Sequence, residues 1–164
     1  MSKKSLGIDI GSSSVKVSLL DIASGECVAS STNPSQEMPI EALQSGWAEQ
    51  DPDMWWKYVV EGIEKISEQY SMGDVASIGI TYQMHGLVAL DKECRPVRKS
   101  IIWCDSRAVE IGAEALESIG REFCLEHTLN SPGNFTASKL AWVKRNEPEL
   151  FEKVATFVLP GDYI

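Results

Sequence analysis

Asp9 is the residue of this sequence that is hardest to explain by structure alone, because it is an acid inside an apolar strand pattern. Leu6, Ile8 and Ile10 alternate around it, which predicts a strand with a buried face. A carboxylate within such a strand is costly unless a cation or hydrogen-bond donors meet it. We therefore predict that Asp9 is a metal-facing or catalytic residue.

Small residues follow this strand, and their backbone could hold a phosphate. Glycine reaches dihedral angles closed to other residues, and serines leave backbone N–H groups open to an anion. The predicted phosphate-binding residues are Gly11, Ser12, Ser13, Ser14 and, more weakly, Lys16. The alternative is a simple hairpin turn with an exposed acid before it. A Walker A loop is excluded, because a strand follows this turn where that motif requires a helix.

Met84 and His85 form a second candidate site at the exit of an apolar run, residues 75–82. This run predicts a strand buried on both sides, and ligands of open α/β sheets sit at the carboxyl ends of strands. His85 could hydrogen-bond a hydroxyl group, or it could be a turn residue satisfied by the backbone. Met84 could contact a ligand or fill a gap.

Trp103 and Asp105 end another short apolar strand and complete the candidate residues. The Trp103 ring could form a flat wall against a sugar or pack in the core. Asp105 could bind a ligand or cap the helix predicted over 108–119.

The elements that must position these residues follow from hydrophobic spacing and turn signals. Two alternating stretches around the small-residue turn predict a hairpin, and a strand through 27–29 extends it to a three-stranded antiparallel meander. Asp51 and Pro52 predict a helix start, with Trp56, Val59 and further apolar residues on its buried face. The run 75–82 is then a parallel partner of the first strand, through a strand–helix–strand crossover.

The second half of the chain is predicted to be mostly helical. Helices are expected from 121, over 137–145 and from 147, before a strand over 154–159. The link 33–50 contains two prolines and reads as a long loop, with Trp47 packed beneath it. Apolar residues at the very end, Tyr163 and Ile164, predict that the sequence is cut from a longer protein.

Composition limits the classes of function. The chain has 164 residues, 43% of them hydrophobic, which suits one domain or part of one. A net charge of −9 without a basic stripe argues against a nucleic-acid partner. The four cysteines are too far apart for a metal or disulfide framework. Without a signal peptide or a long apolar run, we expect a cytoplasmic protein with no membrane contact.

Taken together and in order, several stretches resemble the amino-terminal part of the FGGY carbohydrate kinases, and within that family the xylulokinases. The resemblance covers essentially the whole chain. Its motifs are residues 7–16, 47–56, 83–86, 103–107, 135–143 and 159–163. It implies a ribonuclease-H-like, actin-type α/β fold with a mixed sheet flanked by helices, of which residues 1–164 are a partial amino-terminal domain.

The resemblance also implies a function and a set of site residues. Asp9 matches the acid that serves Mg²⁺, and the turn that follows it matches the part that holds the phosphates of ATP. Met84 and His85 match the xylulokinase form of the sugar site, which makes D-xylulose the expected substrate and its 5-phosphate the product. Trp103 and Asp105 match another wall of that site. A homodimer is one expected state.

One feature of the family has no match here. The resemblance implies a general base, an aspartate, in a part of the family that this sequence does not match, and a general base must reach the proton that it removes. We therefore expect the fragment alone to be inactive. The alternatives are a sugar-binding or sensing module derived from a kinase, and a kinase for a related ketose or polyol.

Overall fold

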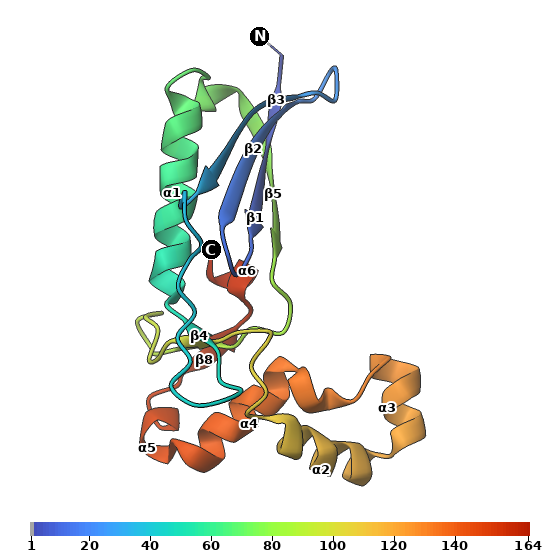
Figure 1. Ribbon diagram of the computed structural model, residues 1–164. Helices are drawn as coiled ribbons and strands as arrows, with labels where there is room; N and C mark the ends of the chain where they lie inside the picture. Colours follow the sequence, from blue (N-terminus) through green and yellow to red (C-terminus); the bar gives the residue numbers. More distant parts are fainter. Residues whose placement is uncertain (1) are drawn as a thin grey trace. The chain divides into compact units, whose positions relative to one another are not determined.

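The computed structural model describes residues 2–164, which form two compact units (Figure 1). The first unit comprises residues up to Pro39 together with Asp53–Gln83 and Ile164, and the second comprises Ile40–Pro52 and Met84–Tyr163. The sequence indicated one domain or part of one. The predicted phosphate-binding residues belong to the first unit, whereas all four predicted sugar-binding residues belong to the second.

A four-stranded mixed sheet, in the order β3-β2-β1-β5, forms the centre of the first unit. Its strands are β1 (Lys4–Ile10), β2 (Val15–Asp21), β3 (Cys27–Asn33) and β5 (Val75–Tyr82). The first three form an antiparallel meander, and β5 pairs with β1 in parallel. The predicted hairpin, meander and crossover are therefore confirmed.

Helix α1 (Pro52–Ser67) is the connection of that crossover and lies along the sheet (Figure 1). Its buried stripe consists of Trp55, Val59, Gly62 and Ile66, at the spacing that places residues on one helical face. The prediction that Trp56 lies on this face is wrong, because Trp56 is 50% exposed and its neighbour Trp55 is fully buried. A Cβ on Gly62 would come within 2.6 Å of Val17 Cγ2, so this glycine permits the close approach of α1 to β2.

Strand β5 is exposed on both faces, contrary to the prediction that both would be buried. Every residue from Ala76 to Thr81 is exposed, including Ile78 and Ile80. The apolar run correctly indicated a strand parallel to β1. However, β5 lies at the edge of the sheet, so it has a strand neighbour on only one side.

The second unit is built from two short antiparallel pairs of strands and several helices. Strand β4 (Glu49–Gln50) pairs with β7 (Ser100–Ile101), and β6 (Val88–Leu90) pairs with β8 (Thr156–Val158). The α-helices are α2 (Val109–Ile119), α3 (Arg121–Thr128), α4 (Thr136–Asn146), α5 (Pro148–Phe151) and α6 (Pro160–Tyr163). The sequence did not predict α6. Short 3₁₀ turns, η1 (Met72–Asp74) in the first unit and η2 (Pro132–Asn134) in the second, complete the elements.

The core of the second unit gathers around Leu87, Ile101 and Val143, all fully buried. Four partly buried side chains pack against them, from Leu140, Trp142, Leu150 and Phe151. This core joins the short strands to α4 and α5. Within residues 2–164, no helix has the length and apolar character needed to cross a membrane.

Candidate functional site

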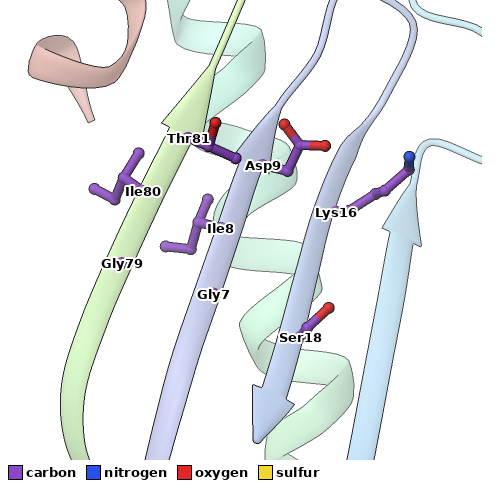
Figure 2. A pocket seen from close by; sticks show the side chains of 8 residues that line it. All are labelled: Gly7, Ile8, Asp9, Lys16, Ser18, Gly79, Ile80 and Thr81. Atoms are coloured by element: carbon purple, nitrogen blue, oxygen red, sulfur yellow. The ribbon is translucent and has the colours of Figure 1, made fainter. Parts of the chain in front are cut away.

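Asp9 lies on the open face of the first unit's sheet. The alternation of β1 places Leu6, Ile8 and Ile10 on the buried face, where each is at most 4% exposed, and turns Asp9 to the other side. Figure 2 shows its carboxylate directed away from Ile8. Asp9 is therefore not an acid in the apolar core, as the strand pattern suggested, but an acid with access to ligands.

The face that carries Asp9 is hollowed, with a volume of about 450 Å³. Lys16 and Thr81 are the cross-strand neighbours of Asp9, on β2 and β5 respectively. The hollow is lined by Gly7, Ile8, Asp9, Lys16, Ser18, Gly79, Ile80 and Thr81 (Figure 2). Within residues 2–164, the Asp9 carboxylate has no hydrogen-bond or ion-pair partner, so it remains available to a ligand or a cation.

The small-residue turn from Gly11 to Ser14 closes the hairpin through one internal hydrogen bond. The Gly11 N–H donates to the Ser14 carbonyl at 3.0 Å, and the Met38 N–H donates to the Ser13 carbonyl at 2.8 Å. A Cβ on Gly11 would lie 2.9 Å from the Ser14 oxygen, so the tight turn requires glycine. The Gly11 N–H is therefore already used within the turn and is not open to an anion.

Met84 and His85 form the start of the second unit. Met84 is 65% exposed. His85 has a φ of 63°, and its ring packs against Phe135 at a centroid distance of 5.1 Å. Partial burial, together with the positive charge of Lys139, holds the pKa of His85 below its ordinary value. A neutral imidazole at neutral pH can both donate and accept a hydrogen bond.

Trp103 is linked to this region through Asn134. The Asn134 Nδ2 group donates to the Trp103 carbonyl at 2.7 Å, while the Asn134 Oδ1 atom accepts from Lys139 at 3.0 Å. Lys139 also donates to the His85 carbonyl at 2.7 Å. These bonds connect His85 with Trp103, and the Trp103 side chain is 46% exposed.

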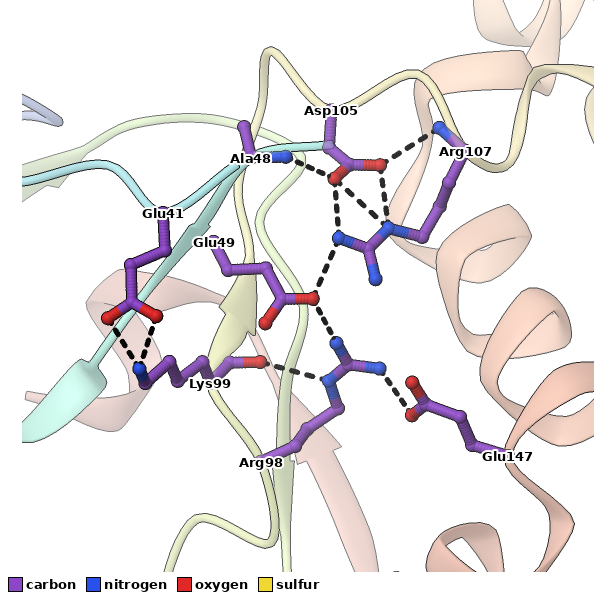
Figure 3. Close-up of polar contacts among 8 residues, drawn as sticks. All are labelled: Glu41, Ala48, Glu49, Arg98, Lys99, Asp105, Arg107 and Glu147. Atoms are coloured by element: carbon purple, nitrogen blue, oxygen red, sulfur yellow. Dashed lines mark hydrogen bonds and ion pairs between the residues drawn. The ribbon is translucent and has the colours of Figure 1, made fainter. Parts of the chain in front are cut away.

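Asp105, in contrast, is buried and fully engaged inside the protein (Figure 3). It accepts from the Ala48 N–H at 2.5 Å and from the Arg107 N–H at 2.9 Å, and the Arg107 guanidinium bonds it through Nε and Nη2. Its side chain is completely shielded from solvent. Asp105 is also not the cap of α2, whose N-cap is Ala108 without a side-chain bond. We therefore assign Asp105 to fixing the chain around Ala48 and Arg107.

Arg107 connects Asp105 to a larger buried network of charges (Figure 3). Its guanidinium lies 3.8 Å from the centroid of the Trp47 ring and 4.9 Å from that of Trp142, and it pairs with Glu49 at 2.7 Å. The predicted packing role of Trp47 is confirmed by these contacts. Glu49 pairs in addition with Arg98, which also binds Glu147. The network holds the segment 40–52 against the rest of the second unit.

Comparison with known protein families identifies the family of this chain. Residues 5–164 match the model of the amino-terminal domain of the FGGY family of carbohydrate kinases. This chain belongs to the FGGY family. The match covers nearly the whole chain and confirms the resemblance seen in the motifs.

FGGY relatives support this membership in both sequence and fold. The xylulose kinase of Escherichia coli K12 is 37% identical over 159 residues, which cover 97% of this chain and 32% of that protein. A xylulose kinase structure from Brucella ovis has a TM-score of 0.86 at 35% identity, over 96% of this chain and 32% of that one. A gluconate kinase from Lactobacillus acidophilus has a TM-score of 0.85 at 27% identity, over 99% and 32%.

These comparisons confirm the predicted actin-like α/β fold with its mixed sheet and flanking helices. The chain spans about a third of the length of the FGGY proteins that it matches. The sugar differs among these relatives while the fold is shared, so the fold alone does not select a substrate.

Two buried residues of this FGGY chain, Lys139 and Arg107, were not among the predicted site residues. Lys139 is 0% exposed, although its type is rarely buried. The available signal was its position four residues before Val143, which places it on the same helical face as that core residue. For Arg107 the signal was weaker, because its partners Glu49 and Trp142 are distant in sequence.

Proposed function

We propose that the complete protein carrying this chain transfers the γ-phosphoryl group of ATP to the 5-hydroxyl of D-xylulose, giving D-xylulose 5-phosphate and ADP. The observation that carries the proposal is Asp9 in an FGGY chain: it lies on an open sheet face two residues before the Gly11–Ser14 turn, and within residues 2–164 its carboxylate has no partner. Asp9 and the turn provide the phosphate side, and the Met84–His85 segment with Trp103 provides the sugar side.

On the phosphate side, the proposed ligands are the backbone groups of Ser12, Ser13 and Ser14. Phosphoryl transfer requires positioning and charge neutralisation more than covalent chemistry from the protein. Lys16 lies on the same face of the sheet as Asp9 and is exposed. It could add positive charge near a phosphate.

Asp9 is the proposed protein ligand of Mg²⁺. Mg²⁺ keeps several waters and takes only one or two carboxylates, which fits the donor set: within residues 2–164, no group of three or more His, Cys, Asp or Glu side chains is arranged to hold a metal. When bound with ATP, the ion would neutralise phosphate charge. Asp9 would hold and orient it.

On the sugar side, neutral His85 would hydrogen-bond a hydroxyl group of the ketose, and the exposed Met84 would contact its C–H face. The half-exposed Trp103 ring offers a flat apolar surface of the kind that covers a sugar ring or chain. Asp105 is left out of this set, because its oxygens already accept five hydrogen bonds from Ala48 and Arg107.

The proposed compartment is the cytoplasm, where ATP is available. All four cysteines, at 27, 94, 104 and 124, are free thiols, which suits a reducing environment.

An ADP-release assay on the complete protein tests the proposed function. D-xylulose, D-gluconate and glycerol are compared at equal concentration with MgATP. We expect the largest kcat/KM with D-xylulose. A preference for D-gluconate or glycerol would contradict D-xylulose as the substrate, but would still support a carbohydrate kinase. Sugar binding without sugar-dependent ADP release would instead support the sensing module.

A further inference from the structure

Lys139 is a buried cation that, among residues 2–164, donates its hydrogen bonds to His85 of the proposed sugar site and to Asn134, the residue that bonds the Trp103 carbonyl. Its ammonium group donates to the His85 carbonyl at 2.7 Å, to the Asn134 carbonyl at 3.0 Å and to Asn134 Oδ1 at 3.0 Å. Three N–H groups meet three acceptors, so the donor capacity of the ammonium is fully used.

No carboxylate of residues 2–164 forms an ion pair with this ammonium group. Among the residues that the structure describes, Lys139 makes no ion pair within 4 Å, although Asp105 is close enough to stabilise its charged form electrostatically. Burying an ammonium without a paired acid is expensive. The three oxygens of His85 and Asn134 are therefore what makes this position tolerable, and they in turn depend on Lys139.

The bond to His85 matters because of the conformation of that residue. A φ of 63° is uncommon for a residue other than glycine and persists where the surroundings hold it. The next residue is constrained as well: a Cβ on Gly86 would come within 2.5 Å of Pro160 Cγ, and the Gly86 carbonyl accepts from the Thr136 hydroxyl at 3.2 Å. The turn that presents His85 is thus fixed from α4 by Thr136 and Lys139.

The second branch of the network reaches Trp103. Asn134 Oδ1 accepts a hydrogen bond from Lys139, and Asn134 Nδ2 donates one to the Trp103 carbonyl. A single buried ammonium therefore fixes both segments that carry the proposed sugar contacts, although these segments are 18 positions apart in the chain.

We propose that Lys139 is the positioning residue of the sugar site: it holds His85 and, through Asn134, Trp103 in the arrangement that binds the ketose, without touching it. This inference rests on the proposed function. It predicts that loss of the Lys139 donors weakens sugar binding selectively, and leaves ATP binding unchanged.

The test compares Lys139→Met in the complete protein with Lys153→Met, which removes an exposed lysine of the same unit. Methionine keeps most of the length of the side chain and removes the donors. We expect Lys139→Met to raise the KM for D-xylulose at least tenfold, and to change the KM for ATP less than twofold. Lys153→Met should leave both constants unchanged. A folded Lys139→Met protein with an unchanged sugar KM would overturn the proposal.

Asn134→Ala provides a second route if Lys139→Met does not fold. It removes one acceptor of Lys139 and the bond to Trp103, and it should also raise the sugar KM selectively. An unaltered sugar KM in Asn134→Ala would contradict the network. Lys139→Arg keeps the charge but not the compact geometry of the ammonium, and should recover only part of the affinity.

A crystal structure of a folded variant separates failure of this inference from failure of the proposed function. If the wild-type protein phosphorylates none of the three substrates, the proposed function fails. The position of His85 still tests the network: we predict that His85 leaves its positive φ or becomes disordered in Lys139→Met. An unmoved His85 would refute the positioning role independently of any sugar.

Discussion

The backbone of Gly112 in α2 lies directly against the backbone of Gly133 in η2: a Cβ on Gly112 would come within 2.0 Å of the Gly133 Cα atom. No side chain can be accommodated at this contact without moving one of the two elements. Since Asn134 follows immediately and receives a bond from Lys139, the helix α2 also fixes one side of the proposed sugar site.

Gly112→Ala is therefore expected to destabilise the second unit and weaken sugar binding. Alanine contributes about 1 kcal/mol in favour of the helix. Overpacking typically costs about 1–3 kcal/mol, and an overlap with backbone belongs at the upper end of that range. Thermal denaturation measures the effect. Gly79→Ala is the control, because a Cβ there would meet nothing within 4 Å. Equal melting temperatures for the two variants would refute the contact.

Arg107→Met is expected to be among the most destabilising single changes in the second unit. It leaves Asp105 and Glu49 buried beside an apolar side chain, and removal of one partner from a buried ion pair costs about 3–5 kcal/mol. Arg145→Met is the matched control, because the Arg145–Glu114 pair is more than half exposed and such surface pairs contribute about 0–1 kcal/mol. Amide hydrogen exchange in the segment 40–52 should become faster only in Arg107→Met. Similar exchange rates in both variants would contradict the claim that Arg107 holds this segment in place.

Asp9→Asn should abolish phosphoryl transfer while the protein stays folded. The amide keeps the shape of the side chain and removes the charge that would hold Mg²⁺. We expect kcat to fall at least a hundredfold, whereas direct binding of sugar, measured by calorimetry, should stay the same because His85 and Trp103 belong to the second unit. Asp74→Asn, in η1 of the same unit, serves as the control. A wild-type kcat in Asp9→Asn would contradict the proposed role of Asp9 in holding Mg²⁺ at the phosphates.

Sugar affinity should decrease as the pH rises through about 8. Burial lowers the pKa of Lys139 to about 8, and Arg107 adds to this effect while Asp105 and Cys104 oppose it. Loss of the proton leaves two N–H donors for three acceptors. His85, with its pKa lowered, is neutral throughout this range, and burial raises the pKa of the Cys104 thiol. Only Lys139 of these groups changes charge near pH 8. Lys139→Met should give a flat profile between pH 7 and 9, and the same slope in that variant would contradict the assignment.

The contribution of Lys139 to stability, unlike sugar affinity, should increase with pH over the alkaline range. The unfolded chain keeps the Lys139 proton up to its ordinary pKa of 10.5, whereas the folded chain releases it from about 8. Between these values the unfolded state binds more protons, so the contribution of Lys139 to the free energy of unfolding increases with pH. The gain amounts to about 3 kcal/mol. Denaturant titrations at pH 7 and 10, with Lys139→Met as the reference, measure it. If the wild-type protein lost more stability than Lys139→Met between pH 7 and 10, the predicted sign would be wrong.

Local patterns were sufficient to predict most of the strands and the helix of the first unit, but not all of their buried faces. Period-two alternation around Asp9 and the small-residue turn predicted the hairpin, and Pro52 predicted the start of α1, because these signals act between near neighbours in the chain. The predicted buried face of α1 was wrong by one residue at Trp56, since two adjacent tryptophans fit the apolar pattern equally well. The apolar composition of β5 predicted a strand, but composition does not reveal which faces are covered.

The second unit was less predictable, because its decisive contacts join distant residues. Asp105 looked like a ligand or a cap, and its actual donors are Arg107 and the N–H of Ala48, 57 positions earlier. Lys139 is tied to His85 across 54 positions. The motifs around these residues predicted a site in this region, and that prediction stays a prediction. Only the folded chain reveals which of the side chains are already used by the protein.

The central claim is that this chain supplies the phosphate and sugar sites of a ketose kinase. Phosphorus NMR of the products formed by the complete protein from MgATP and D-xylulose tests it most directly. We predict one sugar phosphate, substituted at the 5-hydroxyl, in amounts equal to the ADP released. ADP and inorganic phosphate without any phosphorylated xylulose would contradict the claim.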